Sequence, residues 1–461
     1  MTSLRKRIVF GIFFLVGCCV FYGNFRVADK DFFRTFQWDS EALVIGKIFS
    51  EKYGVPMATN LGFIRRSQDQ SSSDFYAGVL SSDSFEHVME RESVIPGEFV
   101  TAGYVSQVGL QGKIFTFLFN TLNLKSIKIF YIFNAVALSL ALLLIAWEYE
   151  NIVPRLGMCF AVATIFSPWV VSFARNLYWV PFTWYLPALF SLYYYKYIHS
   201  CKGKWICAGC IFAAFFIKSL CGYEYLSSII LLAAMPFALS VFMEPSRLSR
   251  IACVKYFSIV CGLGCLGFLC ALLLHANMRG DTVLHGLANI FEQDVLRRTY
   301  GDPSAFSPPH RASLTASPLT VVGMYIFQWK TRVLAFVPGL FGAAFFLVCL
   351  LPSLGALLWE KRMRDRLLTR NLFFLFYAAS IPLSWFILGK AHSYIHTHMN
   401  FVLWYMGFIP VCLFLLTDVC VRYPVFKTQF FQAARTSLRA FGEAAGVIAT
   451  VWKNAGGSGK K

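Results

Sequence analysis

The chain has 461 residues, of which 57% are hydrophobic and only 14% are charged, and its formal net charge is +18. This apolar fraction exceeds what a water-soluble fold of that length needs to bury, so the composition excludes an ordinary soluble protein and indicates a lipid bilayer as solvent. The basic residues are spread over short segments between apolar runs. Because such residues act as topology signals, the charge does not indicate a nucleic-acid partner.

About ten apolar runs, most of them roughly 18 to 25 residues long, predict an all-α polytopic membrane protein, because a helix satisfies its own backbone hydrogen bonds in lipid. The expected spans are 8–22, 128–147, 156–173, 179–198, 204–220, 225–243, 251–275, 334–358, 371–388 and 400–417. We expect one membrane domain over residues 1–425 and a basic cytoplasmic tail over residues 426–461.

The first apolar run follows the basic stretch 4–7 and lacks a small-residue Ala-x-Ala cleavage site, so we expect a retained anchor with its N-terminus inside. The sequence Leu15-Val16-Gly17-Cys18 is similar to a lipoprotein cleavage box, which leaves lipidation of Cys18 as an alternative. Most of the 14 cysteines lie within apolar runs, including the Cys207–Cys210 pair. We therefore expect them to pack as small hydrophobic residues without disulfides.

Residues 26–126 form a long polar segment with ten basic and twelve acidic residues, a balance of −2 in a strongly basic protein. This contrast predicts a first outer, periplasmic loop with juxtamembrane helices. Within it, residues 67–74 are expected to be a mobile loop, and residues 105–122 are apolar enough to lie against the membrane. A second large outer loop is expected over residues 276–332, where prolines break any long helix.

The first outer loop begins with Trp38, Asp39 and Glu41, followed by the apolar positions Leu43 and Val44. This pattern predicts a carboxylate pair at the head of a short, membrane-hugging amphipathic helix. Residues two apart face different sides of a helix, so we expect one of the two, Asp39, to be the working group. Partial desolvation beside Trp38 would raise its pKa toward the range of a general base. The competing interpretation is a solvated loop acid or a helix N-cap.

Charge also orients the later spans. The segments 196–204, 247–255 and 360–370 are basic, so they are expected inside, and an even number of spans then places both termini in the cytoplasm. Arg175 falls in a tight outer turn, where a guanidinium can bind a phosphate in bidentate fashion or simply extend to lipid headgroups.

Two further outer turns carry candidate site residues. Lys218 and Glu224, with Tyr223 beside them, interrupt an apolar stretch, which indicates either a structural ion pair or part of a substrate site. The other turn places Lys390 close to three histidines. These histidines are His392, His396 and His398. Because no carboxylate lies nearby and Lys390 would oppose a cation, we expect an anion site there rather than a metal site.

The order of one span, an outer loop opening with Trp38-Asp39-Ser40-Glu41, many further spans and a second outer loop resembles the GT-C superfamily of membrane glycosyltransferases. The resemblance implies a polyprenyl-phosphate-linked sugar as donor and a general-base or acceptor-orienting role for Asp39. More loosely, it implies that Arg175, Lys218 and Lys390 hold the donor phosphate. No cofactor is implied.

These features predict an inverting glycosyltransferase of the bacterial inner membrane that transfers a sugar to a cell-surface glycan or glycolipid on the periplasmic side. A lipid-phosphate leaving group requires cations, and the acceptor hydroxyl requires a base, which the outer-face residues supply. Two alternatives remain open: a transporter or flippase of a lipid-linked glycan, and a polysaccharide polymerase or ligase. In the last case the turn 390–398, rather than Asp39, would be indispensable.

Overall fold

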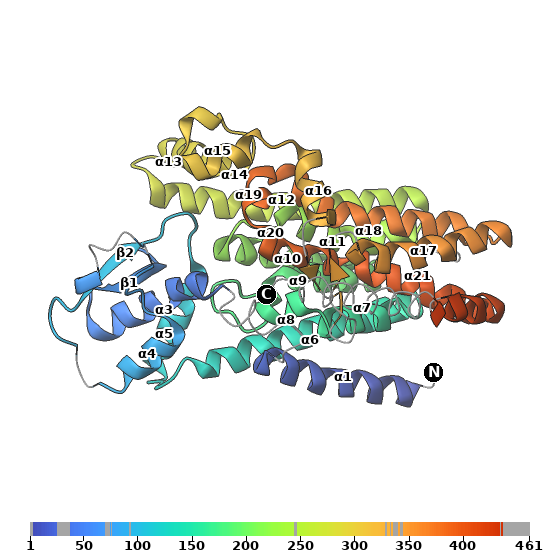
Figure 1. Cartoon of the computed structure of the whole chain (residues 1–461), viewed down its shortest axis with the longest axis horizontal. Coiled ribbons are helices and arrows are strands. Elements are labelled where there is room, and N and C mark those ends of the chain that lie inside the picture. Colours follow the sequence, from blue (N-terminus) through green and yellow to red (C-terminus); the bar gives the residue numbers. More distant parts are fainter. Residues whose placement is uncertain are drawn as a thin grey trace, which may run out of the picture.

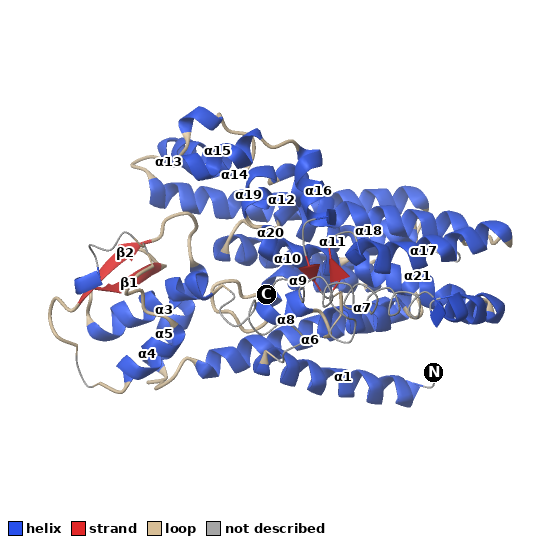
Figure 2. Cartoon of the chain, in the orientation of Figure 1, coloured by secondary structure: helices blue, strands red, loops and turns tan. Residues whose placement is uncertain are grey.

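A computed structural model gives the structure of the chain. It describes residues 3–24, 37–69, 74, 76–91, 94–243, 247–327, 330–331, 333–334, 340–341, 344–433 and 435–436. Helices dominate these residues, and the strands described form two small two-stranded sheets (Figures 1 and 2). The predicted all-α class therefore holds for most of the chain.

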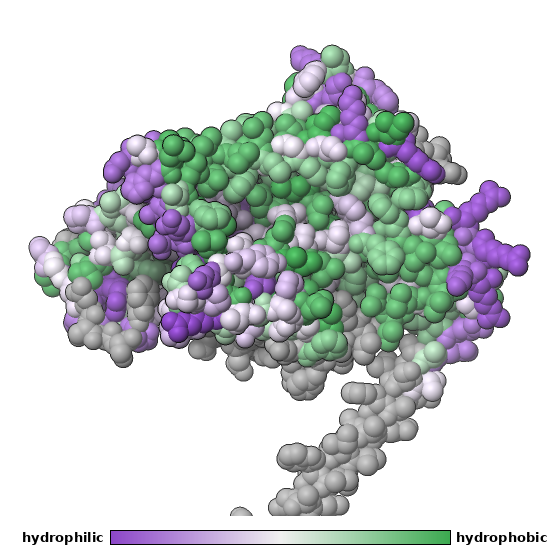
Figure 3. Space-filling view, turned by 90° about the horizontal axis from the view of Figure 1, so that it is seen from above, coloured by the Kyte–Doolittle hydropathy of each residue, from purple (hydrophilic) through white to green (hydrophobic). Residues whose placement is uncertain are grey.

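Each of the expected apolar runs contains a helix or a pair of helices. The helices are α1 (Ser3–Gly23), α6 (Lys128–Ile152), α7 (Leu156–Ile165), α8 (Pro168–Phe173), α9 (Phe182–Lys196), α10 (Cys201–Cys221), α11 (Leu226–Ser240), α12 (Arg250–Arg279), α17 (Ala344–Arg362), α18 (Leu368–Leu388) and α21 (Phe408–Arg422). On the face shown in Figure 3, hydrophobic residues form a broad band across the middle of the molecule, and hydrophilic residues gather toward its ends.

Four helices in the described part of the chain, α6, α10, α12 and α18, are long and apolar enough to cross a membrane. A fifth span is added if the segment Thr397–Met406 and α21, which meet at 43°, are counted as one. These helices are consistent with a multi-pass membrane protein. Others are shorter than the predicted runs: α7 has 10 residues and α11 has 15. At 1.5 Å per residue they span only about half to three quarters of a bilayer core of about 30 Å.

The connecting segments lie at two opposite ends of the bundle (Figure 1). At one end, which we call the basic end, the end of α6 meets the start of α1 and the end of α9, and the start of α7 meets the end of α21. The contacts that join them are Lys6–Asn151, Lys196–Glu148 and Arg155–Asp418. The two predicted outer loops meet at the opposite end, the site end, where Arg279 donates a hydrogen bond of 2.7 Å to the carbonyl oxygen of Val105.

The first predicted outer loop folds as a small α/β layer. Strands β1 (Gly62–Arg66) and β2 (Phe99–Gly103) pair antiparallel, and three helices pack with them. These helices are α3 (Trp38–Tyr53), α4 (Ser82–Met89) and α5 (Leu110–Thr121). Of the expected mobile loop 67–74, residues 67–69 form a short 3-10 helix, and residues 70–73 lie outside the described residues.

Helix α3 is a core helix, so the prediction of a membrane-hugging surface helix is wrong. All nine residues from Ala42 to Ser50 are buried. At Gly46 a Cβ atom would lie 2.0 Å from the carbonyl oxygen of Gly62, so α3 contacts the backbone of β1 directly. The amphipathic pattern predicted that α3 has one face toward lipid and one toward solvent. In the structure β1 and α5 pack against α3 and cover these faces.

The second predicted outer loop is a chain of short helices above the bundle (Figure 1). They are α13 (Val283–Ile290), the π-helix η2 (Phe291–Val295), α14 (Leu296–Arg298), η3 (Pro303–Ala305), α15 (Pro308–Thr315) and α16 (Pro318–Phe327), followed by the strands β3 (Lys330–Thr331) and β4 (Leu340–Phe341). Before α21 come α19 (Lys390–Ile395), α20 (Thr397–Asn400) and the 3-10 helix η4 (Phe401–Met406). Of the predicted tail, residues 437–461 lie outside the described residues.

The buried apolar side chains of the bundle and of the α/β layer form one main hydrophobic cluster. It joins the α/β layer to the helices of the bundle, for example through Phe115 of α5 and Phe130 of α6, whose ring centroids are 4.7 Å apart. All 14 cysteines are free, and Cys207 is buried in the bundle. The site end is therefore a rigid continuation of the bundle core.

Candidate functional site

Asp39 and Glu41 diverge from the first turn of α3, as expected for helical residues two apart. Asp39 accepts a hydrogen bond from the phenol of Tyr76 and lies close enough to His398 to interact with it electrostatically. The Trp38 ring packs 5.7 Å from the Tyr76 ring. Asp39 therefore faces the residues of the turn 390–398, which the sequence proposed as an anion site.

Glu41 faces a different pocket. Its carboxylate accepts hydrogen bonds from the Tyr131 hydroxyl (2.9 Å) and the Leu177 backbone N–H (3.1 Å). Burial raises the pKa of Glu41, although these two hydrogen bonds oppose the shift. Arg175 lies over the Tyr131 ring, 5.1 Å from its centroid, and donates to the carbonyl oxygen of Tyr22. Glu41 and Arg175 thus line one cavity of about 230 Å³, the Glu41 pocket, which does not include Asp39.

The turn between α8 and α9 fixes the start of α3. The Trp179 indole N–H donates to the side-chain oxygen of Gln37 (3.0 Å), and its ring stacks on Tyr225 with the planes 13° apart. Three residues of this framework have left-handed backbone conformations: Gln37 (φ 57°), Val180 (φ 35°) and Tyr225 (φ 66°). Such strain persists only where the surroundings enforce it, and it concentrates at functional sites.

The two predicted phosphate-binding lysines are already bonded to backbone oxygens. The Lys218 ammonium donates to the carbonyl oxygens of Gly222 (2.5 Å) and Glu224 (2.7 Å). The Lys390 ammonium donates to those of Leu314 (2.6 Å) and Ala316 (2.8 Å). In this arrangement both lysines hold turns together, and their ammonium groups donate to backbone oxygens at the positions where the sequence predicted phosphate binding.

Three histidine rings form a row, which we call the imidazole row, between α18 and Asp39. The ring centroids of His392 and His396 are 4.4 Å apart, those of His396 and His398 are 5.6 Å apart, and Trp385 lies 5.7 Å from His392. Burial, and then the neighbouring imidazoles and arginines, lower the pKa of His392 well below its usual value and that of His396 to about 3. Both rings are therefore neutral at pH 7.

Several buried polar atoms around the imidazole row have no hydrogen-bond partner among the described residues. They include Nδ1 of His310, Nδ1 of His392, Nδ1 of His396, Nε1 of Trp385 and Nε2 of Gln107. Buried polar groups in native proteins are nearly always paired, so a gathering of such atoms marks a place where ordered water or a polar ligand supplies the partners.

Next to this row lies an arginine cluster that the sequence reasoning missed. Arg279, Arg297 and Arg298 surround Asp294 at N···O distances of 3.0, 3.3 and 3.9 Å, and Arg298 also lies 3.6 Å from Glu224. Three guanidinium groups and two carboxylates leave a net charge of +1. Both arginines of α14 interact with the imidazoles of His392 and His396.

A signal for this cluster was present in the sequence. Arg297 and Arg298 are adjacent in a loop expected on the outer side, where a positive charge does not serve topology. The same reasoning selected Arg175. The second loop is long, and its sequence does not show that α14 packs against the turn 390–398.

The predicted substrate residues Tyr223 and Glu224 border this cluster. The Tyr223 hydroxyl lies 3.0 Å from Nδ1 of His275, whose Nε2 lies 2.9 Å from the Val105 carbonyl oxygen. Gly222 has φ 156°, and a Cβ atom there would lie 2.6 Å from the Glu224 carboxylate. Only glycine leaves Glu224 room to face Arg298.

An apolar groove of about 450 Å³ borders the arginine cluster, because Asp294 and Arg298 are part of its lining. Its walls come from the start of α11, the last turns of α12, the α13–η2 segment and the end of α18. Phe268, Leu272 and Leu388 are among the apolar residues, and Asp294 and Arg298 are the charged ones. A long apolar chain with one anionic end fits this distribution.

The described residues contain no group of histidine, cysteine, aspartate and glutamate side chains able to hold a metal ion. The chain matches no protein-family model, no curated protein and no solved structure. The function is therefore argued from the site. It offers a carboxylate, a row of neutral imidazoles and an arginine cluster with excess positive charge beside an apolar groove.

Proposed function

We propose that the chain is a membrane glycosyltransferase that takes a sugar from a polyprenyl phosphate and transfers it to a cell-surface glycan or glycolipid. One observation carries the proposal. Arg298 lines the apolar groove and interacts electrostatically with His396, while His398, the next ring of the imidazole row, interacts in the same way with Asp39. A polyprenyl phosphate has the matching polarity, since its long hydrocarbon chain carries a single anionic head.

In this mechanism Arg298 and Arg297 hold the donor phosphate and stabilise the negative charge that it gains as the sugar departs. Asp39 accepts the proton of the acceptor hydroxyl, and attack opposite the phosphate inverts the anomeric carbon. The neutral imidazoles lie between the two and can exchange hydrogen bonds with sugar hydroxyl groups through their unpaired Nδ1 atoms. Arg175 and Glu41, which the sequence placed in the same site, are assigned to the Glu41 pocket instead.

The positive-inside rule orients the basic end toward the cytoplasm, which places the site end on the outer side of a bacterial inner membrane. In this topology both termini are cytoplasmic and about ten helical segments make up the membrane body, with residues 26–126 and 276–332 as periplasmic loops.

A polysaccharide polymerase or ligase is the second candidate. The unpaired Nδ1 atoms of His392 and His396 favour it, because a neutral imidazole with a free nitrogen can accept a hydrogen bond from a glycan hydroxyl group. Mass spectrometry of surface glycans tests both candidates in cells that express the native chain, Asp39→Asn or His396→Gln. A glycosyltransferase with Asp39 as base loses one sugar residue in the Asp39→Asn cells. If those cells keep the complete glycan while the His396→Gln cells accumulate unpolymerised units, the second candidate replaces the first.

A further inference from the structure

The basic end of the bundle contains a second large cavity, of about 990 Å³, on the opposite side of the molecule from the candidate site. It lies where α6, α11, α12 and α18 begin or end. Its charged lining consists of Arg250, Arg366 and Arg370. Among the described residues, no aspartate or glutamate lines it, so its described lining carries only positive charges.

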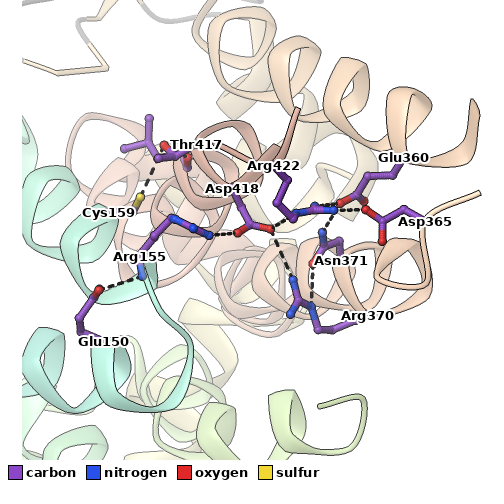
Figure 4. Close-up of polar contacts among 11 residues, drawn as sticks. Glu150, Arg155, Cys159, Glu360, Asp365, Arg370, Asn371, Thr417, Asp418 and Arg422 are labelled. Atoms are coloured by element: carbon purple, nitrogen blue, oxygen red, sulfur yellow. Dashed lines mark hydrogen bonds and ion pairs between the residues drawn. The ribbon is translucent and has the colours of Figure 1, made fainter. Parts of the chain in front are cut away.

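Most other arginines near this cavity are neutralised by a carboxylate network (Figure 4). Arg422 pairs with Glu360, Asp365 and Asp418, and Asp418 also pairs with Arg155. Arg370 reaches Asp418 at 3.7 Å. The three arginines Arg155, Arg370 and Arg422 therefore face the three carboxylates Glu360, Asp365 and Asp418, and the network has no net charge.

Arg250 and Arg366 differ from these arginines. Neither pairs with a carboxylate among the described residues, and both are exposed on the cavity rim. Topology signals alone require basic residues at this end, but they do not require them to gather around a cavity whose described lining holds no acidic residue. The remaining wall includes the apolar residues Ile152, Phe242 and Leu248 together with Ser240, Ser249 and Thr369.

The geometry points to a binding site for the phosphate of an anionic phospholipid from the leaflet that surrounds the basic end. The guanidinium groups of Arg250 and Arg366 bind the phosphodiester, and Arg370 approaches it from the neutral network. The apolar residues of the wall receive the glycerol and the first methylene groups. A water-soluble phosphate would use the arginines but gain nothing from those apolar residues. This site is independent of the proposed transferase activity.

Binding is measured with the full chain purified in detergent, by native mass spectrometry and by thermal unfolding. The probes are phosphatidylglycerol, phosphatidylcholine and inorganic pyrophosphate. The test variant is Arg250→Gln/Arg366→Gln. The matched control is Arg362→Gln/Arg364→Gln, which removes the same charge from exposed residues at the same end that do not line the cavity.

We expect the native chain to retain phosphatidylglycerol in preference to phosphatidylcholine. The test variant loses about tenfold in affinity, and the control changes by less than about twofold. Equal losses in both variants would show a diffuse charge effect and overturn the site. Pyrophosphate binding more tightly than phosphatidylglycerol would overturn the assignment to a lipid. All four arginines are exposed, so we expect both variants to fold like the native chain. Thermal unfolding without lipid checks this.

Discussion

Arg298 is expected to contribute both to the stability of the fold and to the proposed transfer reaction, and variants can separate the two contributions. Its guanidinium lies 3.6 Å from Glu224 and 3.9 Å from Asp294, and both carboxylate side chains are only 6% exposed. Removing one partner of a buried ion pair costs about 3 to 5 kcal/mol. Asp294 keeps Arg279 and Arg297, so Arg298→Gln should cost near the lower end, about 3 kcal/mol. Losing a cation at the leaving phosphate should also slow transfer by about 10² to 10³.

The double variant Arg298→Gln/Glu224→Gln separates these effects. It has two arginines and one carboxylate, so it keeps the native net charge of +1 but lacks the guanidinium that lines the groove. Thermal unfolding in detergent should show stability largely restored. Transfer from extracted polyprenyl-phosphate sugar should stay about 100-fold slower or worse. Glu224→Gln alone keeps Arg298 and should stay within about tenfold of the native rate. Native transfer in the double variant would refute the role of Arg298.

Three further predictions concern the framework. Glu41→Ala leaves the Leu177 N–H and the Tyr131 hydroxyl without an acceptor, so thermal unfolding should show a loss of about 1 to 3 kcal/mol; an unchanged stability would contradict the role of Glu41 as an anchor of α3. Gly46→Ala forces a Cβ atom against β1 and should cost about 1 to 3 kcal/mol, whereas Gly11→Ala, which meets no neighbour, should cost nothing measurable; equal costs would count against the close packing of α3. The pKa values of His392 and His396 are lowered in the folded chain, so below pH 6.5 the folded chain binds fewer protons than the unfolded chain. The free energy of unfolding should therefore fall by about 1 kcal/mol per histidine as the pH drops from 7 to 5.5. His396→Gln should reduce this dependence of stability on pH.

The positions of the long helices and of the basic segments can be predicted from the sequence. The reason is that the bilayer, rather than tertiary contacts, sets the length of apolar runs and the charge of the segments between them. The runs at 128–147 and 251–275 became α6 and α12, and the basic segments gathered at one end. The lengths of α7 and α11 did not follow. Serine and proline at positions 167 and 168 begin a new helix inside an apolar run, and hydropathy does not detect that break.

The candidate site was predicted in part. The divergence of Asp39 and Glu41 follows from helical periodicity alone. The sequence proposed the turn 390–398 as an anion site, and the structure brings His398 of that turn near Asp39. The pairing of Glu41 with the pocket of Arg175 and the approach of Arg298 to Glu224 depend on contacts between residues far apart in the chain. No local pattern specifies such contacts, so the arginine cluster became visible only in the folded structure.

The central claim is that Asp39 and the arginine cluster belong to one active site, in which the cluster binds the donor phosphate and Asp39 takes the proton of the acceptor hydroxyl. The direct measurement compares native and Asp39→Asn protein, both in lipid nanodiscs, for the affinity of a polyprenyl phosphate and for the rate of sugar transfer. The account predicts that Asp39→Asn binds the lipid within about threefold of the native affinity but transfers about 10² to 10⁴ times more slowly. Transfer at the native rate by Asp39→Asn would contradict the account.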